Sequence, residues 1–147
     1  MNLLKKLILF LLLLLGGYEL KAQTDSVALY VDSCQCGGNN FVLDFVEEMP
    51  EPPGGWDAWP AYVLKNLRYP PEYKEQAISG TVYIGFVVDV NGNICSILIR
   101  KGIPGGPKLD EEALRVVKES SPWTPGKMNG KPVCVRMTIP VKICLTE

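Results

Sequence analysis

Alternating hydrophobic positions mark two strands in the middle of the chain. The residues that share one face of the segment 81–89 are Val82, Ile84, Phe86 and Val88, the pattern of a strand with one buried side. The segment 93–101 follows after Asn91-Gly92, the strongest short hairpin signal in a sequence. Its alternation puts Cys95, Ile97 and Ile99 on one face. We predict an antiparallel hairpin in which Cys95 is a buried thiol on the core side.

A third strand is predicted near the end of the chain, at residues 133–143. One face carries Val133, Val135, Met137, Ile139, Val141 and Ile143, and the other carries Cys134, Arg136, Thr138, Pro140 and Lys142. Proline cannot donate a ladder hydrogen bond and is confined to edges, strand starts and bulges. Pro140 therefore predicts that this strand lies at an edge of the sheet. If the Pro140 nitrogen faces outward, the usable edge shortens to residues 134–139.

Helical patterns complete the predicted fold. A helix starts near Ala58 and ends before Tyr69, and a short second helix begins at Pro70-Pro71 and is closed by Gly80. Residues 109–120 form an amphipathic helix with Leu109, Ala113, Val116 and Val117 on one side. The order of elements predicts an α+β fold. Its three-stranded antiparallel sheet has the order 2-1-3, with two to three helices on one face.

The N-terminal segment divides into two predicted parts. Lys5 and Lys6 precede a short apolar run at residues 7–15, and Ala22 supplies a small exit residue, which is the layout of a secretory signal peptide. We therefore assign residues 1–22 to a signal and residues 23–46 to an extension with a possible β-hairpin. Residues 47–147 form the main domain. The prediction is an exported, periplasmic protein; the alternative is an inner-membrane protein anchored by an uncleaved signal.

Composition narrows the function. The 147 residues carry a formal net charge of −1 and no histidine, which excludes Ser-His and Cys-His catalysis and His-containing metal sites. The sequence has no cluster of basic residues of the kind that would predict nucleic-acid binding. Asp110, Glu111 and Glu112 lie in the first turn of a predicted helix, where acidic residues favour the helix dipole. The sequence thus predicts no enzyme, no metal, no cofactor and no small-molecule substrate.

Cysteines and exposed side chains leave several alternatives. The chain has five cysteines, so at least one thiol stays unpaired. Cys34 and Cys36 are a candidate redox pair, but a structural disulfide from their loop to Cys134 or Cys144 is favoured. The aromatic residues Trp56, Trp59, Tyr62 and Trp123 form either a ligand-stacking patch or, as favoured here, core packing. Arg136 and Lys142 either steer an acidic peptide or protect a solvated edge.

Four further motifs stand out in the chain: VEEMP with PGG at 46–55, KNLRYPPEYKEQAISGTVYIGFVVDVNGNI at 65–94, LDEEALRVVK at 109–118 and WTPGK at 123–127. Together they resemble the C-terminal domain of TonB, in the form common in Bacteroidetes. The resemblance covers about two-thirds of the chain and implies a fold of three antiparallel strands with two helices.

The resemblance also implies a function in TonB-dependent transport. Its members bind the N-terminal peptide (the TonB box) of outer-membrane transporters by β-strand addition. Carried over to this chain, the binding edge is Val133, Cys134, Val135, Arg136, Met137, Thr138 and Ile139, and the family's Tyr-Pro motif is Tyr69-Pro70. The alternatives are a structural cell-envelope protein that forms a homodimer through its edge strand, and a thiol oxidoreductase built on Cys34 and Cys36.

Overall fold

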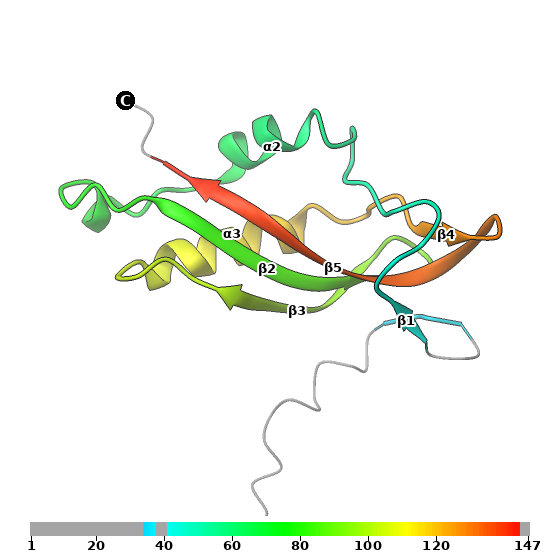
Figure 1. Cartoon of the computed structure of the whole chain (residues 1–147). Coiled ribbons are helices and arrows are strands. Elements are labelled where there is room, and N and C mark those ends of the chain that lie inside the picture. The colour runs from blue at the N-terminus through cyan, green and yellow to red at the C-terminus, as the bar shows by residue number, and fades with distance from the viewer. Residues whose placement is uncertain (1–33, 38–40, 145–147) are drawn as a thin grey trace, which may run out of the picture.

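The computed structural model describes residues 34–37 and 41–144, and the fold within them is α+β (Figure 1). The strands are β1 (Val42–Leu43), β2 (Gly80–Val88), β3 (Ile94–Lys101), β4 (Gly126–Met128) and β5 (Lys131–Ile143). The helices are α2 (Trp59–Asn66) and α3 (Pro107–Glu119), with a 3₁₀ helix, η2, at Pro71–Tyr73. The predicted signal peptide and the segment 27–32 of the possible hairpin lie outside the described residues.

The sheet is larger and more mixed than predicted. Its order is β1-β5-β2-β3, with β4 paired to the start of β5. The antiparallel arrangement β3-β2-β5 matches the predicted order of the three central strands. β1 adds a short parallel strand beyond β5, in which Val42 is paired with Cys134 and Leu43 with Val135. The sheet is therefore not a purely antiparallel sheet of three strands.

The core lies between the sheet and the helices α2 and α3, which cover one of its faces (Figure 1). The inward residues of β2 are those predicted from alternation, and each of Val82, Ile84, Phe86 and Val88 is at most 1% exposed. α3 contributes Leu109, Ala113, Val116 and Val117, all fully buried. Trp123 packs edge-on against Phe86 and Trp59, which supports the packing role favoured for the aromatic residues.

A β-bulge makes the predicted position of Cys95 wrong. Gly85 is paired with Leu98, but Val87 is paired with Cys95, so two residues of β3 stand opposite Phe86 alone. Ser96 lies in the bulge with a φ of 50°. A bulge of this kind shifts the side-chain alternation by one position. Cys95 is therefore buried on the face opposite the helices, where it packs with Val87 and Cys134.

Two turns differ from the sequence prediction. The predicted second helix is only the single turn of η2, and Gly80 begins β2 instead of ending that helix. Residues 126–133 form the β4–β5 hairpin, which is not among the strands predicted from the sequence. Its turn residues Asn129 and Gly130 have φ values of 50° and 73°, as a two-residue type I′ turn requires. The Asn-Gly pair was the signal that would have revealed this hairpin.

Candidate binding site at the edge of the sheet

β5 is a strand whose outer edge is only partly occupied. At its start, Val133 is paired with Gly126 of β4. On the side away from β2, β1 pairs with Cys134 and Val135. No strand among the described residues pairs with that side of β5 from Arg136 onward. Of the edge proposed from the sequence, residues 133–135 thus already have partners, and residues 136–139 remain open together with 140–143.

Pro140 indicates which backbone groups face outward along this open edge. The pairing of β2 with β5 runs from Gly80–Ile143 to Val88–Val135 without a shift, and Pro140 stands opposite Tyr83. In an antiparallel ladder, hydrogen-bonded and non-bonded pairs alternate. Since Pro140 has no N–H, its pair with Tyr83 fits the non-bonded position. The amide groups of Arg136, Thr138 and Lys142 then point away from β2. The Arg136 amide faces β1, because the parallel pair of Leu43 with Val135 is bonded through the residues on either side of Val135. Thr138 and Lys142 are therefore the donors that face a strand added at this edge.

An apolar groove of about 350 Å³ runs beside the C-terminal half of this edge, between α2 and β5. It is lined by Trp59, Pro60, Val63, Leu64 and Leu67 from α2 and by residues 140–144. Leu64 is 61% exposed, although the neighbouring Val63 is buried. A strand added to β5 would place every second side chain over this groove. The edge therefore offers main-chain hydrogen bonds beside an apolar surface.

The position of α2 is fixed by contacts with α3. The Arg115 guanidinium donates to the Asn66 carbonyl at the end of α2 (2.8 Å) and to Glu112 (2.8 and 2.9 Å). Glu112 also accepts from the Arg68 amide (3.0 Å). These hydrogen bonds, those from Arg115 first, hold the pKa of Glu112 below its usual value. Glu112 therefore has a structural role and stabilises one wall of the groove. It does so through these hydrogen bonds and not through the predicted helix dipole, because α3 begins at Pro107 and its acidic first-turn residue is Asp110.

The Tyr-Pro pair lies near the groove but does not line it. The Tyr69 hydroxyl donates to the Ile78 carbonyl and to the Tyr73 carbonyl, and its ring packs against the core. Pro70 precedes the first residue of η2. Tyr69 and Pro70 are not among the groove-lining residues. The motif orders the connection between α2 and β2, and a direct contact with a partner remains a prediction.

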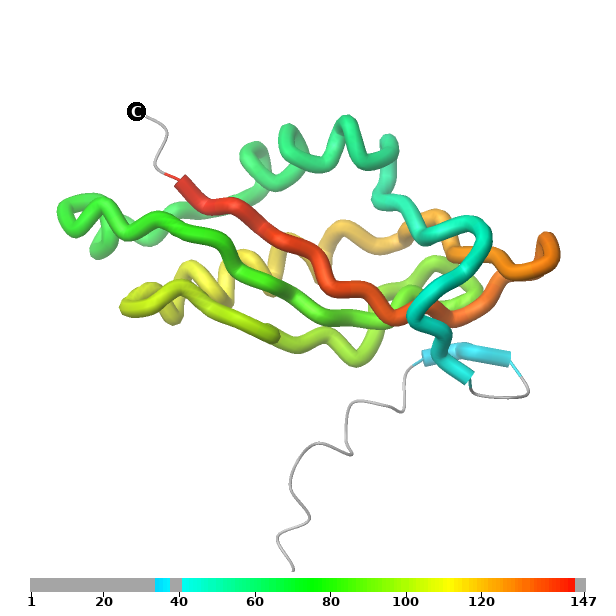
Figure 2. The backbone as a smooth tube through the Cα atoms, in the orientation of Figure 1, coloured from blue at the N-terminus to red at the C-terminus, as the bar shows by residue number. Residues whose placement is uncertain are grey.

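Two disulfides fasten the N-terminal segment to the opposite face of the sheet. Cys34 is bonded to Cys95 of β3, and Cys36 to Cys134 of β5. Cys34-Gln35-Cys36 is therefore a strap, which packs against Val87 of β2 and lies on the side of the sheet away from α2 (Figure 2). The bridge predicted from this loop to an end cysteine is thus formed by Cys134. Cys144 is exposed and carries the free thiol, and Cys34 and Cys36 have none.

Asp89 secures the strap to the hairpin loop. Its fully buried carboxylate accepts hydrogen bonds from the amides of Asn91 and Asn93 (both 2.9 Å) and from the Gln35 amide (3.4 Å). The Val90 amide donates to the Gln35 carbonyl (3.3 Å). Sequence reasoning did not single out Asp89, although an acidic residue two positions before Asn91-Gly92 is typical of a side chain that orders a turn.

Comparisons with known proteins identify a family. The family described as Gram-negative bacterial TonB protein C-terminal matches residues 65–142, which is more than half of the chain. Two NMR solution structures of the Helicobacter pylori TonB C-terminal domain are similar, at 22% and 21% identity with TM-scores of 0.45 and 0.48. The matched regions span 59% and 62% of this chain, and 77% and 94% of the two Helicobacter pylori chains. No curated protein matches. None of the described helices has the length and apolar character needed to cross a membrane.

Proposed function

Because the chain belongs to the family of Gram-negative bacterial TonB C-terminal domains, we propose that it is a periplasmic module that binds the N-terminal peptide of an outer-membrane transporter. The family is associated with TonB-dependent transport. In the proposed mechanism, the peptide adds as a strand to the open edge of β5. The role is one of binding, and the chain contributes backbone hydrogen bonds and an apolar groove.

The observation that carries this proposal is the open edge at residues 136–143 beside the α2 groove. Strand addition needs unpaired backbone groups for affinity and pockets for alternate side chains for specificity. The amides of Thr138 and Lys142 supply the first, and Leu64 with its neighbours supplies the second. β1 already occupies the edge through its pairs with Cys134 and Val135, so the bound peptide pairs with β5 from Met137 onward.

The other edge of the sheet is less suited to strand addition. The pairing of β3 with β2 shifts its register at two places, which lie between Tyr83 and Ile84 and between Gly85 and Val87 of β2. Bulges of this kind disrupt a ladder, and basic side chains such as Arg100 and Lys101 further protect an edge. The regular pairing of β5, in contrast, keeps its backbone straight enough to receive a partner. This difference selects β5 as the binding edge.

An NMR titration with N-terminal peptides of transporters from the same organism tests the proposal. We expect saturable shifts at the amides of Thr138 and Lys142 and at the methyl groups of Leu64. A peptide of the same composition in scrambled order is the control. Shifts that are absent, or confined to β3, would refute the assignment.

Sedimentation distinguishes peptide binding from self-association. If the free protein forms a dimer whose dissociation is promoted by the peptide, the two partners compete for the same edge. If the protein dimerises and no transporter peptide binds, the edge serves homodimer formation and the structural role in the cell envelope replaces the proposed one.

A further inference from the structure

The three long strands carry basic residues and no acidic ones. β2, β3 and β5 contain no Asp or Glu, and their basic residues are Arg100, Lys101, Lys131, Arg136 and Lys142. The whole chain has a net charge of −1, so its negative charge is located elsewhere. α3 carries four acidic residues, Asp110, Glu111, Glu112 and Glu119, against three basic ones, Lys108, Arg115 and Lys118. Positive charge is therefore concentrated on the sheet of an overall acidic protein.

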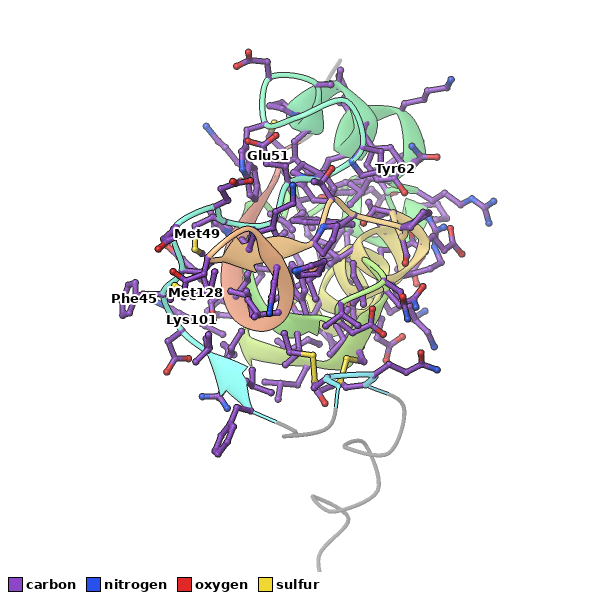
Figure 3. All side chains as sticks on the ribbon, turned by 90° about the vertical axis from the view of Figure 1, so that its right-hand side faces the viewer. Phe45, Met49, Glu51, Tyr62, Lys101 and Met128 are labelled. Atoms are coloured by element: carbon purple, nitrogen blue, oxygen red, sulfur yellow. A yellow bond between two sulfur atoms is a disulfide. The ribbon has the colours of Figure 1, made fainter. Side chains whose placement is uncertain are left out.

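Four of these cations belong to the sheet face that the helices leave uncovered. Tyr83 lies on this face because its neighbours Val82 and Ile84 point into the core. Lys101 is paired with Tyr83, Lys142 with Thr81, and Arg136 with Val87. Arg100 lies across Gly85, since a Cβ at Gly85 would meet the Arg100 Nε at 2.7 Å. The helices and Tyr62 lie on the other side of the molecule from Lys101 (Figure 3).

Most of this charge is not neutralised within the described residues. Arg136 has a partner, because its Nη1 lies 3.3 Å from the Asp44 carboxylate. The ion pairs of the described part of the chain involve none of Arg100, Lys101 and Lys142. The Lys101 ammonium lies 6.0 Å from the centre of the Tyr83 ring, which leaves its charge intact.

Exposed apolar side chains lie among the cations. Tyr83 is 38% exposed and Leu98 is 41% exposed, and both point from the same face because Leu98 is paired with Gly85. Phe45 is 86% exposed and projects on the same side of the molecule as Lys101 (Figure 3). Aromatic and aliphatic side chains bordered by Lys and Arg are typical of surfaces that rest on the headgroup region of a bilayer.

We propose that this basic sheet face, formed by Arg100, Lys101, Arg136 and Lys142 around Tyr83 and Leu98, docks onto an anionic phospholipid surface. The cations lie on β3 and β5, on either side of β2, whereas the apolar groove suited to a peptide lies beside α2. A broad sheet surface fits a lipid surface better than it fits a single acidic peptide. The cations would contact lipid phosphates, and Tyr83, Leu98 and Phe45 would enter the headgroup region.

This inference goes beyond peptide binding and does not depend on it. The peptide site is the in-plane edge of β5, and the lipid site is the face of the same sheet. The two sites are therefore compatible. A domain lying on the membrane by this face would present its β5 edge parallel to the bilayer surface.

Vesicle co-sedimentation of the full chain tests the proposal. Vesicles of equal parts phosphatidylglycerol and phosphatidylethanolamine are compared with phosphatidylcholine vesicles, at low and high salt. Each basic residue near an anionic surface changes the binding constant about fivefold. The double variant Lys101→Gln/Lys142→Gln is therefore expected to bind the anionic vesicles about 25-fold more weakly. High salt should reduce wild-type binding as well.

The control is Lys65→Gln/Lys118→Gln, which removes two exposed lysines from α2 and α3. All variants carry the same N-terminal residues, so differences between them report the sheet face. Two results would overturn the proposal. In the first, the control variant and the sheet variant lose binding to the same extent; in the second, both variants bind as strongly as the wild type. Binding of soluble poly-glutamate without binding of anionic vesicles would assign the face to an acidic protein and also overturn it.

Discussion

Cys36 and Cys134 are 98 residues apart in the chain, yet their Cα atoms lie 5.2 Å apart across a disulfide. β1 occupies the outer edge of β5 at Cys134 and Val135, and its pairing ends at Val135, the residue after Cys134. The disulfide thus holds the N-terminal segment against β5 and defines where the open edge begins. The predictions that follow test this arrangement, the open edge and the support of the groove.

The first prediction concerns the long disulfide. The variant Cys36→Ser/Cys134→Ser should lose about 2–4 kcal/mol of unfolding free energy, because the unfolded chain is no longer constrained by a cross-link. The measurement is urea denaturation under non-reducing conditions. Cys144→Ser is the control and should unfold like the wild type, since Cys144 is exposed and unbonded. Equal stability of the double variant would contradict a structural role for this bridge.

The second prediction concerns the backbone donors of the edge and rests on the proposed peptide function. Pro140→Thr should supply an outward N–H and tighten binding of a transporter peptide about fivefold, the equivalent of one net hydrogen bond of about 1 kcal/mol. Thr138→Pro should weaken binding by a similar factor. Isothermal titration measures both, with Thr138→Val as a control that keeps the amide. If Pro140→Thr weakened binding and Thr138→Pro tightened it, the backbone nitrogen of Pro140 would face β2 instead of the open edge.

The third prediction concerns the apolar groove. Leu64→Lys should weaken peptide binding about tenfold, because about 1.4 kcal/mol of apolar contact with the peptide is lost. Its unfolding free energy should change by no more than about 0.5 kcal/mol, since Leu64 is 61% exposed. The control is Lys65→Ala, one residue away and outside the groove lining. Unchanged affinity of the Leu64 variant would show that the peptide does not reach α2.

The fourth prediction concerns pH and the support of α2. The pKa of Glu112 is lowered in the folded state, chiefly by hydrogen bonds from Arg115. Its carboxylate therefore adds stability that is fully present above the unfolded pKa of about 4.3. This stability is lost as the pH falls through the lower folded pKa. Glu112→Gln should cost about 1–3 kcal/mol at neutral pH.

The measurement is urea denaturation of wild type and Glu112→Gln at neutral and strongly acidic pH. The difference between the two proteins should shrink toward zero in acid. Glu111→Gln, at an exposed position beside it, is the matched control and should show little difference at either pH. A cost of Glu112→Gln that stays constant with pH would mean that the charge of Glu112 is not what stabilises the junction of α2 and α3.

The central secondary structure could be predicted from the sequence because its patterns are regular. The inward face of β2, the amphipathic α3 and the placement of α2 before the Tyr-Pro pair follow from hydrophobic spacing and proline positions. The order β3-β2-β5 follows from the handedness and length of the connections. The edge position predicted from Pro140 holds only for the part of β5 beyond Val135, because β1 and β4 pair with its first residues.

The position of Cys95 and the pairing of β1 could not be predicted by the same reasoning. The bulge at Ser96 adds one residue to β3, and alternation alone does not reveal such an insertion. β1 has only two residues, too few for a pattern, and its place beside β5 is set by a disulfide to a residue 98 positions away. Long-range covalent partners of this kind leave no local signal.

The strap has a topological consequence for how the chain responds to proteases. Cys34 and Cys36 are joined to partners on β3 and β5, so the two bridges close overlapping covalent rings. A single backbone cut between residues 37 and 94 leaves two fragments joined by both bridges. A cut between residues 96 and 133 leaves them joined by the Cys36–Cys134 bridge. Either loop system can thus be nicked once without separating α2 from the strand whose edge it borders.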